Sequence, residues 1–365
     1  MNRKILAPLL SILLLAGVGV AIYFSASEQF AIRQQQEIRG LVGSEKMPFF
    51  TDPEVIAALA KHGMKVAVEK AGSRQIALRK DIKEYDFVFP AGVPAAEKIK
   101  REHQVHQAHT IFFTPMAIAS WKIIAEILED NGIVQKHDNI HYIINMEALL
   151  TKIVDETRWS MLKNSEKYAV NKGVLITSTD IRQSNSAAMY LSLASFVLNG
   201  HDILTSEDQV QRLLPRLSAL FLRQGYVESS SAGPYDDYLV MGPGKAPLVM
   251  IYEAQFLHDA ARQKGVINSD MVLLYPEPTV FTKHILLPLS KAGEQLAEIL
   301  SNDPDMQLLE IKHGFRNKNT QAFKDFVDKN NLAVPANLYK VVEPPSYEIL
   351  EHTIQQIEEK YQQQM

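Results

Sequence analysis

Residues 38–46, IRGLVGSEK, and residues 64–74, MKVAVEKAGSR, decide the fold of this 365-residue chain. Each begins as a short strand-like run containing Val, Ile or Leu and ends in small and hydroxylated residues with a cation. Between them, Asp52-Pro53-Glu54 begins a helix, because Asp is a good N-cap and Pro and Glu suit the first turn. The alternation of strands and helices predicts an α/β fold with a mainly parallel sheet.

The loops that follow these strands form the first candidate site. They are Gly43-Ser44-Glu45-Lys46, Gly72-Ser73-Arg74 and Pro90-Ala91-Gly92. In a parallel sheet such loops lie at one edge, beside helix N-termini. Free N–H groups, serine hydroxyls and helix dipoles together suit an anion or a hydrogen-bonding solute. The alternative is that Gly and Ser only form the turns.

A second α/β unit follows in the sequence. A strand-like segment at 174–177 leads into a serine-rich loop at 178–186 and a long helix at 187–198. Further strand-like segments lie at 248–251 and 271–275. Two α/β lobes whose loop edges face each other predict a cleft between them, where ligands commonly bind.

These segments together resemble a bacterial extracellular solute-binding protein with the type II periplasmic-binding-protein fold. The residues that carry the resemblance are Gly43-Ser44-Glu45-Lys46, Ala71-Gly72-Ser73-Arg74, Ser178-Thr179-Asp180, Ser184-Asn185-Ser186, residues 249–256, residues 273–279 and Gly314-Phe315-Arg316. The resemblance covers residues 38–316. It implies two lobes joined by crossings near residues 113–115 and 279–281. It also implies noncovalent capture of a solute for an ABC-type permease.

The expected domain organisation combines this resemblance with the ends of the chain. The predicted parts are a signal-anchor or transmembrane helix at 1–27, a linker at 28–37, lobe one at 38–115 and 279–335, lobe two at 116–278, and a C-terminal amphipathic helix segment at 336–365.

The candidate ligand-binding residues lie in the loops described above. They are Ser44, Lys46, Ser73, Arg74, Ala91, Asp180, Ser184, Asn185, Ser186, Glu253 and Tyr275. The resemblance includes molybdate- and tungstate-type binders, which hold a bare oxyanion with neutral groups. Lys46 and Arg74 depart from that pattern and favour a carboxylated or phosphorylated solute. Glu253 would equally well cap a helix and pair with a neighbour, and Tyr275 would otherwise be a core residue. The loop at 229–234 is a flexible loop that would form a lid if it lies at the cleft edge.

The N-terminus predicts the compartment. Residues 5–24 are twenty consecutive residues without a charge, which at about 1.5 Å per residue span a hydrocarbon core of roughly 30 Å. Arg3 and Lys4 precede them, so the rest of the chain is exported. We expect a single-pass anchor in the inner membrane with the bulk of the chain extracytoplasmic. The alternative is a signal peptide cleaved after Ser27, which would leave a secreted or periplasmic protein.

Composition excludes several classes of protein. The net charge is -4, with Lys+Arg 38 against Asp+Glu 42, so nucleic acid is not an expected partner. The chain has no cysteine, which excludes disulfides, thiol catalysis and Cys-ligated metals. The sequence contains no Gly-x-Ser-x-Gly elbow or His-Glu-x-x-His motif, and neither a nucleophile–base pair nor a cofactor fingerprint is evident. We therefore expect no enzyme activity, no cofactor and no metal.

The C-terminal segment is amphipathic. Tyr347, Leu350, Ile354, Ile357 and Tyr361 follow at helical steps of three and four residues, which predicts a helix with one apolar face. This helix would dock on lobe one or bind a partner. It supports a second hypothesis, in which the chain is a membrane-anchored interaction or signalling module that docks on another membrane protein and has no transport role.

Overall fold

The fold is built around one mixed sheet. The computed structural model describes residues 35–225, 227–262, 265–338 and 340–364. Neighbouring strands follow the order β2-β1-β3-β9-β4-β8-β6-β5, with β7 paired to β4 and β10 paired to β9. The strands are β1 (Gln36–Val42), β2 (Met64–Lys70), β3 (Phe87–Phe89), β4 (His109–Trp121), β5 (Val134–His137), β6 (Ile140–Ile143), β7 (Leu248–Tyr252), β8 (Met271–Pro276), β9 (Thr279–Pro288) and β10 (Val341–Val342).

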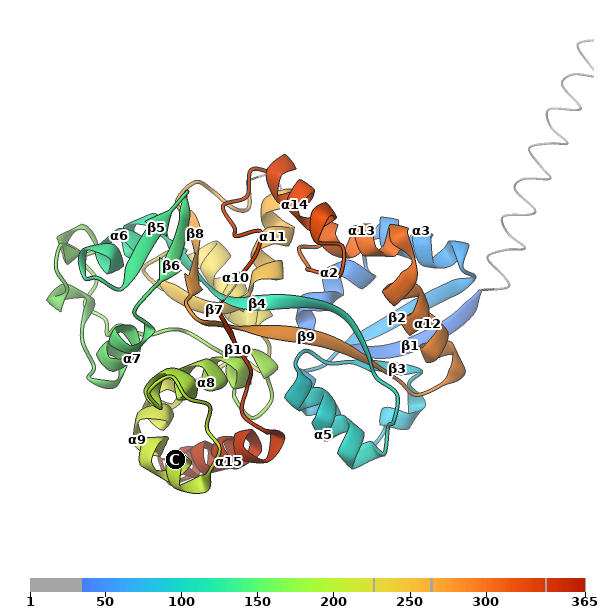
Figure 1. Ribbon diagram of the computed structural model, residues 1–365, viewed down its shortest axis with the longest axis horizontal. Helices are drawn as coiled ribbons and strands as arrows, with labels where there is room; N and C mark the ends of the chain where they lie inside the picture. Colours follow the sequence, from blue (N-terminus) through green and yellow to red (C-terminus); the bar gives the residue numbers. More distant parts are fainter. Residues whose placement is uncertain (1–34, 226, 263–264, 339, 365) are drawn as a thin grey trace, which may run out of the picture.

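Helices connect and cover these strands (Figure 1). They are the short 3-10 helix η1 (Ser44–Lys46) and the helices α2 (Met47–Phe50), α3 (Pro53–Lys61), α4 (Ser73–Ala77), α5 (Val93–His103), α6 (Lys122–Asp130), α7 (Met146–Val154), α8 (Asn185–Leu198), α9 (Glu207–Leu222), α10 (Ala232–Met241), α11 (Glu253–Arg262), α12 (Lys291–Asn302), α13 (Pro304–Lys312), α14 (Thr320–Lys329) and α15 (Tyr347–Gln364). Asp52 caps α3 as predicted, because its side chain accepts from the Glu54 N–H at 2.7 Å.

The prediction of a mainly parallel sheet is correct for β2-β1-β3, whose strands pair parallel, and β6 with β8 and β10 with β9 also pair parallel. β9 pairs antiparallel with β3 and β4, and β4 pairs antiparallel with β7 and β8. The reason is that β9 returns from the far half of the sheet and enters the near half in the opposite direction. The predicted strand at 174–177 is reduced to a single backbone pairing of Thr177 with Val249.

Two long strands join the halves of the molecule. β4 pairs with β9 from His109 opposite Leu286 to Pro115 opposite Phe281, and then continues between β7 and β8. Figure 1 shows β4 and β9 running side by side across the middle of the molecule. The crossings expected near residues 113–115 and 279–281 fall within these strands. The limits of the lobes, residues 38–115 and 279–335 for lobe one and 116–278 for lobe two, remain a prediction.

Each half has its own core. In lobe one, Phe87 and Phe89 of β3 pack in one apolar cluster with α3 and α12, and Val88 packs in another with α4 and α5. This alternation follows from the two-residue period of a strand. A separate, larger cluster fills lobe two. Phe323 and Val327 of α14 join the lobe two cluster, although we expected residues 279–335 in lobe one. The reason is that the chain turns back at Arg316, which pairs with Phe113 of β4.

Helix α15 lies across both lobes. Leu350, Ile354 and Ile357 are buried as the amphipathic pattern predicts. They belong to the apolar cluster of lobe two, and the helix packs mainly on α9 and also touches α5 of lobe one. Docking on lobe one was therefore the wrong expectation, because the apolar stripe fits α9, whereas α15 meets α5 through charged side chains and the ring of Tyr347, which lies against Arg101.

The predicted anchor at residues 5–24 lies outside the residues that the structure describes. Within the described ranges, no helix has both the length and the apolar character needed to cross a membrane.

Candidate solute site between the lobes

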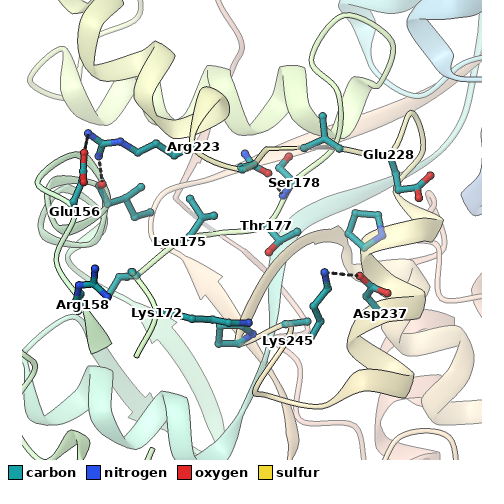
Figure 2. Close-up of a pocket in the computed structure, with 18 of the residues that line it drawn as sticks. Glu156, Arg158, Lys172, Leu175, Thr177, Ser178, Arg223, Glu228, Asp237 and Lys245 are labelled. Carbon is teal, nitrogen blue, oxygen red and sulfur yellow. Dashed lines mark hydrogen bonds and ion pairs between the residues drawn. The ribbon is translucent and has the colours of Figure 1, made fainter. Parts of the chain in front are cut away.

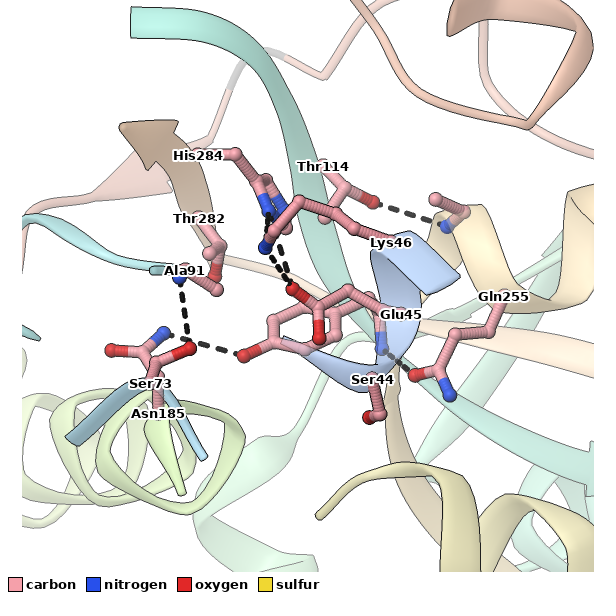
Figure 3. Close-up of polar contacts among 12 residues, drawn as sticks. Ser44, Glu45, Lys46, Ser73, Ala91, Thr114, Asn185, Gln255, Thr282 and His284 are labelled. Atoms are coloured by element: carbon pink, nitrogen blue, oxygen red, sulfur yellow. Dashed lines mark hydrogen bonds and ion pairs between the residues drawn. The ribbon is translucent and has the colours of Figure 1, made fainter. Parts of the chain in front are cut away.

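A buried ion pair lies where the loop after β1 meets β9. The Lys46 side chain is fully buried and pairs with Glu45, and its Nζ lies 3.0 Å from Nδ1 of His284. Figure 3 shows the three side chains pointing toward one another. Burial alone would raise the pKa of Glu45, but Lys46 and His284 lower it to about 2. Burial, helped by Lys46, lowers the pKa of His284 to about 4, so the imidazole is neutral at pH 7.

Hydroxyl and amide groups from both lobes surround this pair. The Ala91 N–H donates to Ser73 Oγ at 2.9 Å, and Asn185 Nδ2 donates to the Tyr252 hydroxyl at 3.4 Å. The Asn185 Oδ1 atom is buried without a hydrogen-bond partner among the described residues. Ser184 and Ser186 share a hydrogen bond of 2.9 Å beside Asn185 at the start of α8. The structure thus gathers most of the predicted residues, as the edge-of-sheet argument expects.

The lobes touch closely around this cluster. The Arg74 N–H donates to the Gln183 carbonyl at 3.2 Å. Gly92 has a φ of +88°, and a Cβ there would lie 2.1 Å from Asn185 Oδ1. Only glycine satisfies both conditions without a shift of its neighbours. Lobe one and lobe two are therefore in contact at the helix N-termini that the sequence predicted as a solute site.

Arg74 has an internal partner. Its guanidinium holds both carboxylate oxygens of Glu351 in α15, with Nη2 to Oε2 at 2.8 Å. Lys98 of α5 lies 3.5 Å from the same carboxylate. Asp180, another predicted residue, is held by Arg182, with Nη2 to Oδ2 at 2.7 Å. Sequence reasoning identified Arg74 but missed Glu351, since nothing local links the two.

Glu253 and Tyr275 lie outside this cluster. Arg316 holds Glu253 with two hydrogen bonds of 2.7 Å, and the Tyr275 hydroxyl donates to the same carboxylate at 2.7 Å. Glu253 and Tyr275 are fully buried. Glu253 therefore pairs with a neighbour, which was one of its two expected roles, and Tyr275 is part of the core.

The open space between the lobes lies beside η1 and α2. It is a pocket of about 410 Å³ lined by Ser44, Glu45, Met47, Pro48, Thr51, Ala232, Tyr235, Asp236, Ala254, Gln255, His258, Asp259 and His313. The Ser230 hydroxyl donates to Ser44 Oγ at 2.8 Å, so the predicted serine loop reaches lobe one. Sequence reasoning missed most of the lining. One signal was available, because Gln255, His258 and Asp259 are spaced to share one helix face.

A larger cavity of about 620 Å³ lies within lobe two (Figure 2). Arg223 pairs with Glu156 at 2.8 Å and Lys245 lies 3.8 Å from Asp237 at its rim. Ser178 also lines it, and its Oγ is buried without a partner among the described residues. All its lining residues come from residues 153–247, so lobe one does not contribute to it.

No family model and no curated protein sequence matches this chain. Solved structures do match it. A periplasmic thiamin binding protein has 12% identity and a TM-score of 0.57, over 89% of this chain and 96% of that chain. The sulfate-binding protein SubI from Mycobacterium tuberculosis H37Rv has 14% identity and a TM-score of 0.53, over 84% and 94%. The periplasmic binding protein AfuA from Actinobacillus pleuropneumoniae, with fructose-6-phosphate bound, has 11% identity and a TM-score of 0.53, over 88% and 97%.

At these identities the likeness concerns the fold. The chain has the type II periplasmic-binding-protein fold, as the loops of the sequence led us to expect. The fold by itself does not define a ligand.

Proposed function

We propose that this chain is an extracytoplasmic solute-binding protein that captures a small solute between its two lobes, without chemistry, for an ABC-type permease. The observation that carries this proposal is the pocket of about 410 Å³ whose walls come from both lobes. Ser44 and Met47 belong to lobe one, and Tyr235 and Gln255 to lobe two. A solute in this pocket would contact both lobes and would therefore favour the closed form.

The strands and contacts around the pocket support closure as the mechanism. β4 and β9 connect the lobes on one side. The hydrogen bond from Ser230 to Ser44 and the ion pair of Arg74 with Glu351 join the lobes away from these strands. Opening would bend the two strands and break these contacts, together with the hydrogen bond from the Arg74 N–H to the Gln183 carbonyl. This is the geometry of a hinge opposite a closing edge.

The tether is part of the same proposal. The uncharged residues 5–24 would hold the protein at the outer face of the inner membrane, near a permease. Cleavage after Ser27 would instead release a periplasmic carrier. The mass of the mature chain, purified from membranes and from the periplasm, separates the two. A chain that begins at residue 28 would refute the tether.

Thermal unfolding of the full chain in detergent tests solute capture. The panel contains oxyanions, sugar phosphates, amino acids, carboxylates, amines and divalent metals. A solute at 100 times its Kd stabilises the folded state by about 2.7 kcal/mol, and each kcal/mol moves the Tm of a domain of this order by about 2–4 °C. Ser44→Ala should weaken the response, and Ser160→Ala, at an exposed position of lobe two, should not. No shift with any solute would refute capture.

An anionic solute was expected from Lys46 and Arg74, and it remains the finer prediction. Each cation already pairs with a carboxylate of the chain, Lys46 with Glu45 and Arg74 with Glu351. A bound anion would have to displace one of these carboxylates. Because Glu351→Ala frees Arg74, this variant should bind the anion more tightly than the parent.

The cluster around Lys46, Ser73 and Asn185 is occupied by the side chains of the protein itself. This favours a second candidate function, the membrane-anchored interaction module. In that function the lobes stay closed, and the exposed face of α15 contacts a membrane partner. Affinity purification from crosslinked membranes tests it. A partner that is retained by the Ser44→Ala and Arg74→Ala variants and lost on removal of residues 347–365 would support it. A partner lost equally with all three would count against it.

A further inference from the structure

The pocket between the lobes has an uneven charge. Asp236 and Asp259 contribute carboxylates, and Glu45 contributes a third that already pairs with Lys46. No Lys or Arg is among the described residues that line it. An anion would therefore meet carboxylates on the walls, whereas a cation would be attracted by them. Lys70, which is not part of the lining, lies near enough to Asp236 to oppose the rise of its pKa. Asp259 has no such cation nearby among the described residues.

Asp259 is the decisive side chain. It is 8% exposed. Among the described residues it has no cation within the 4.0 Å of an ion pair. Burial raises the pKa of Asp259, the Tyr235 hydroxyl opposes that rise, and the neighbouring Asp236 adds to it. Taking a carboxylate out of water without a counter-ion is costly. A bound cation would remove that cost.

The two histidines of the pocket add no positive charge. Their rings stack at 4.8 Å between centroids. Burial and the nearby Arg262 lower the pKa of His258 to about 4, and burial, His258 and Arg262 lower that of His313 to about 3. The positive charge of Arg262 is used elsewhere, because its guanidinium pairs with Asp52. His313 is 2% exposed, and its Nδ1 has no hydrogen-bond partner among the described residues.

The neutral groups of the lining set the size and polarity of the occupant. A volume of about 410 Å³ falls in the lower part of the range for small-molecule sites. The Ser44 hydroxyl and the Gln255 amide give hydrogen bonds, and Met47, Pro48 and Ala254 give an apolar wall. This combination suits a short organic molecule with an ionic end.

We propose that the solute captured between the lobes is a small organic ammonium ion, whose N–H groups donate to Asp259 and Asp236 while its carbon chain lies against Met47 and Ala254. This inference rests on the proposed function and assigns its solute class. It is the alternative to the anionic solute predicted from Lys46 and Arg74, whose charges are already balanced within the chain.

Isothermal titration of the full chain in detergent tests the proposal with 1,4-diaminobutane and ethanolamine as probes. Tetramethylammonium has the charge but no N–H donor, and sodium chloride controls for ionic strength. Both amines should bind, and tetramethylammonium at least about tenfold more weakly. Asp259→Asn should weaken amine binding by about tenfold or more, because a charge-assisted hydrogen bond is lost. Asp328→Asn, on the exposed face of α14, should leave it unchanged.

Weaker amine binding by the variants can be separated from a loss of folding. Asp259→Asn removes a buried charge, so the variant without solute should unfold at the same or a higher urea concentration than the parent. Asp236→Asn, at an exposed position, gives a second variant with little risk to the fold. Binding of sulfate or phosphate instead of amines would overturn the ammonium proposal and leave solute capture standing. Binding of no probe of either sign would overturn both.

Discussion

The ion pair between Arg74 and Glu351 should hold lobe one against α15. The perturbation is a double-mutant cycle with Arg74→Ala, Glu351→Ala and the double variant. The Arg74 side chain is 4% exposed and that of Glu351 is 21% exposed, so the pair lies between the surface and buried cases. Surface pairs contribute up to about 1 kcal/mol, and breaking a fully buried pair costs about 3–5 kcal/mol. Because the contact is bidentate, we expect a coupling free energy of about 2 kcal/mol.

Urea unfolding measures this coupling. Each single variant should lower the free energy of unfolding, and the double variant should lower it by less than the sum of the two. Glu359→Ala is the matched control, since Glu359 is exposed on the same helix, and its effect should stay within about 0.5 kcal/mol. Leu350, Ile354 and Ile357 should keep α15 on α9 in every variant.

A second readout tests the geometry. Loss of the pair should let the lobes separate, so small-angle scattering should give a larger radius of gyration for Glu351→Ala than for Glu359→Ala. A coupling below about 0.5 kcal/mol with an unchanged radius would refute the reasoning. It would mean that Glu351 covers Arg74 without holding the lobes together.

Three further predictions concern buried groups. The folded-state pKa values of His258, His284 and His313 are lowered to about 4, 4 and 3, so the unfolded chain binds more protons below its His pKa of about 6.5. The free energy of unfolding should therefore fall as pH drops from about 6.5 toward 4, by up to about 4 kcal/mol per pH unit, and His284→Gln should reduce that slope by about a third in urea titrations. A flat profile would contradict the burial of these rings. Gly92→Ala should lower the Tm more than Gly132→Ala, since both have positive φ but only Gly92 faces another residue, Asn185 Oδ1; equal losses would mean that the lobes do not meet there. Arg316→Met should cost about 3–5 kcal/mol because it leaves the charge of Glu253 buried without a counter-ion, with only the Tyr275 hydroxyl as a hydrogen-bond donor. Adding Glu253→Gln should recover part of that loss; no recovery would show that Arg316 acts through packing alone.

Local patterns predicted the first part of the fold well. Apolar runs, the Asp52 cap and the small-residue loops are short-range signals, and they specify β1, α3 and β2 without knowledge of the rest of the chain. Ser44, Ser73 and Ala91 could be placed together because parallel strands end at one edge. The antiparallel entry of β9 was not predictable in this way, since its direction depends on where the chain returns.

The partners of the charged residues were not predictable. Lys46 and His284 are 238 positions apart, and Arg74 and Glu351 are 277 apart. A sequence shows that a cation follows a strand. It does not show whether an adjacent carboxylate, such as Glu45, or a distant one, such as Glu351, will neutralise that cation. The anionic solute was therefore inferred from charges that the fold later balances. The spacing of Gln255, His258 and Asp259 placed Asp259 on one helix face with the other two, but it did not show that this face would line a pocket.

Helix α15 would affect how fast a solute enters and leaves the protein. Under the proposed function, a solute enters and leaves only while the lobes are apart. If the ion pair between Arg74 and Glu351 favours the closed form by about 2 kcal/mol, the lobes would be apart roughly one-thirtieth of the time. Entry and escape would slow by the same factor, and the equilibrium affinity would change little. The helix that ends the chain would thus set how long a captured molecule stays, without contacting that molecule.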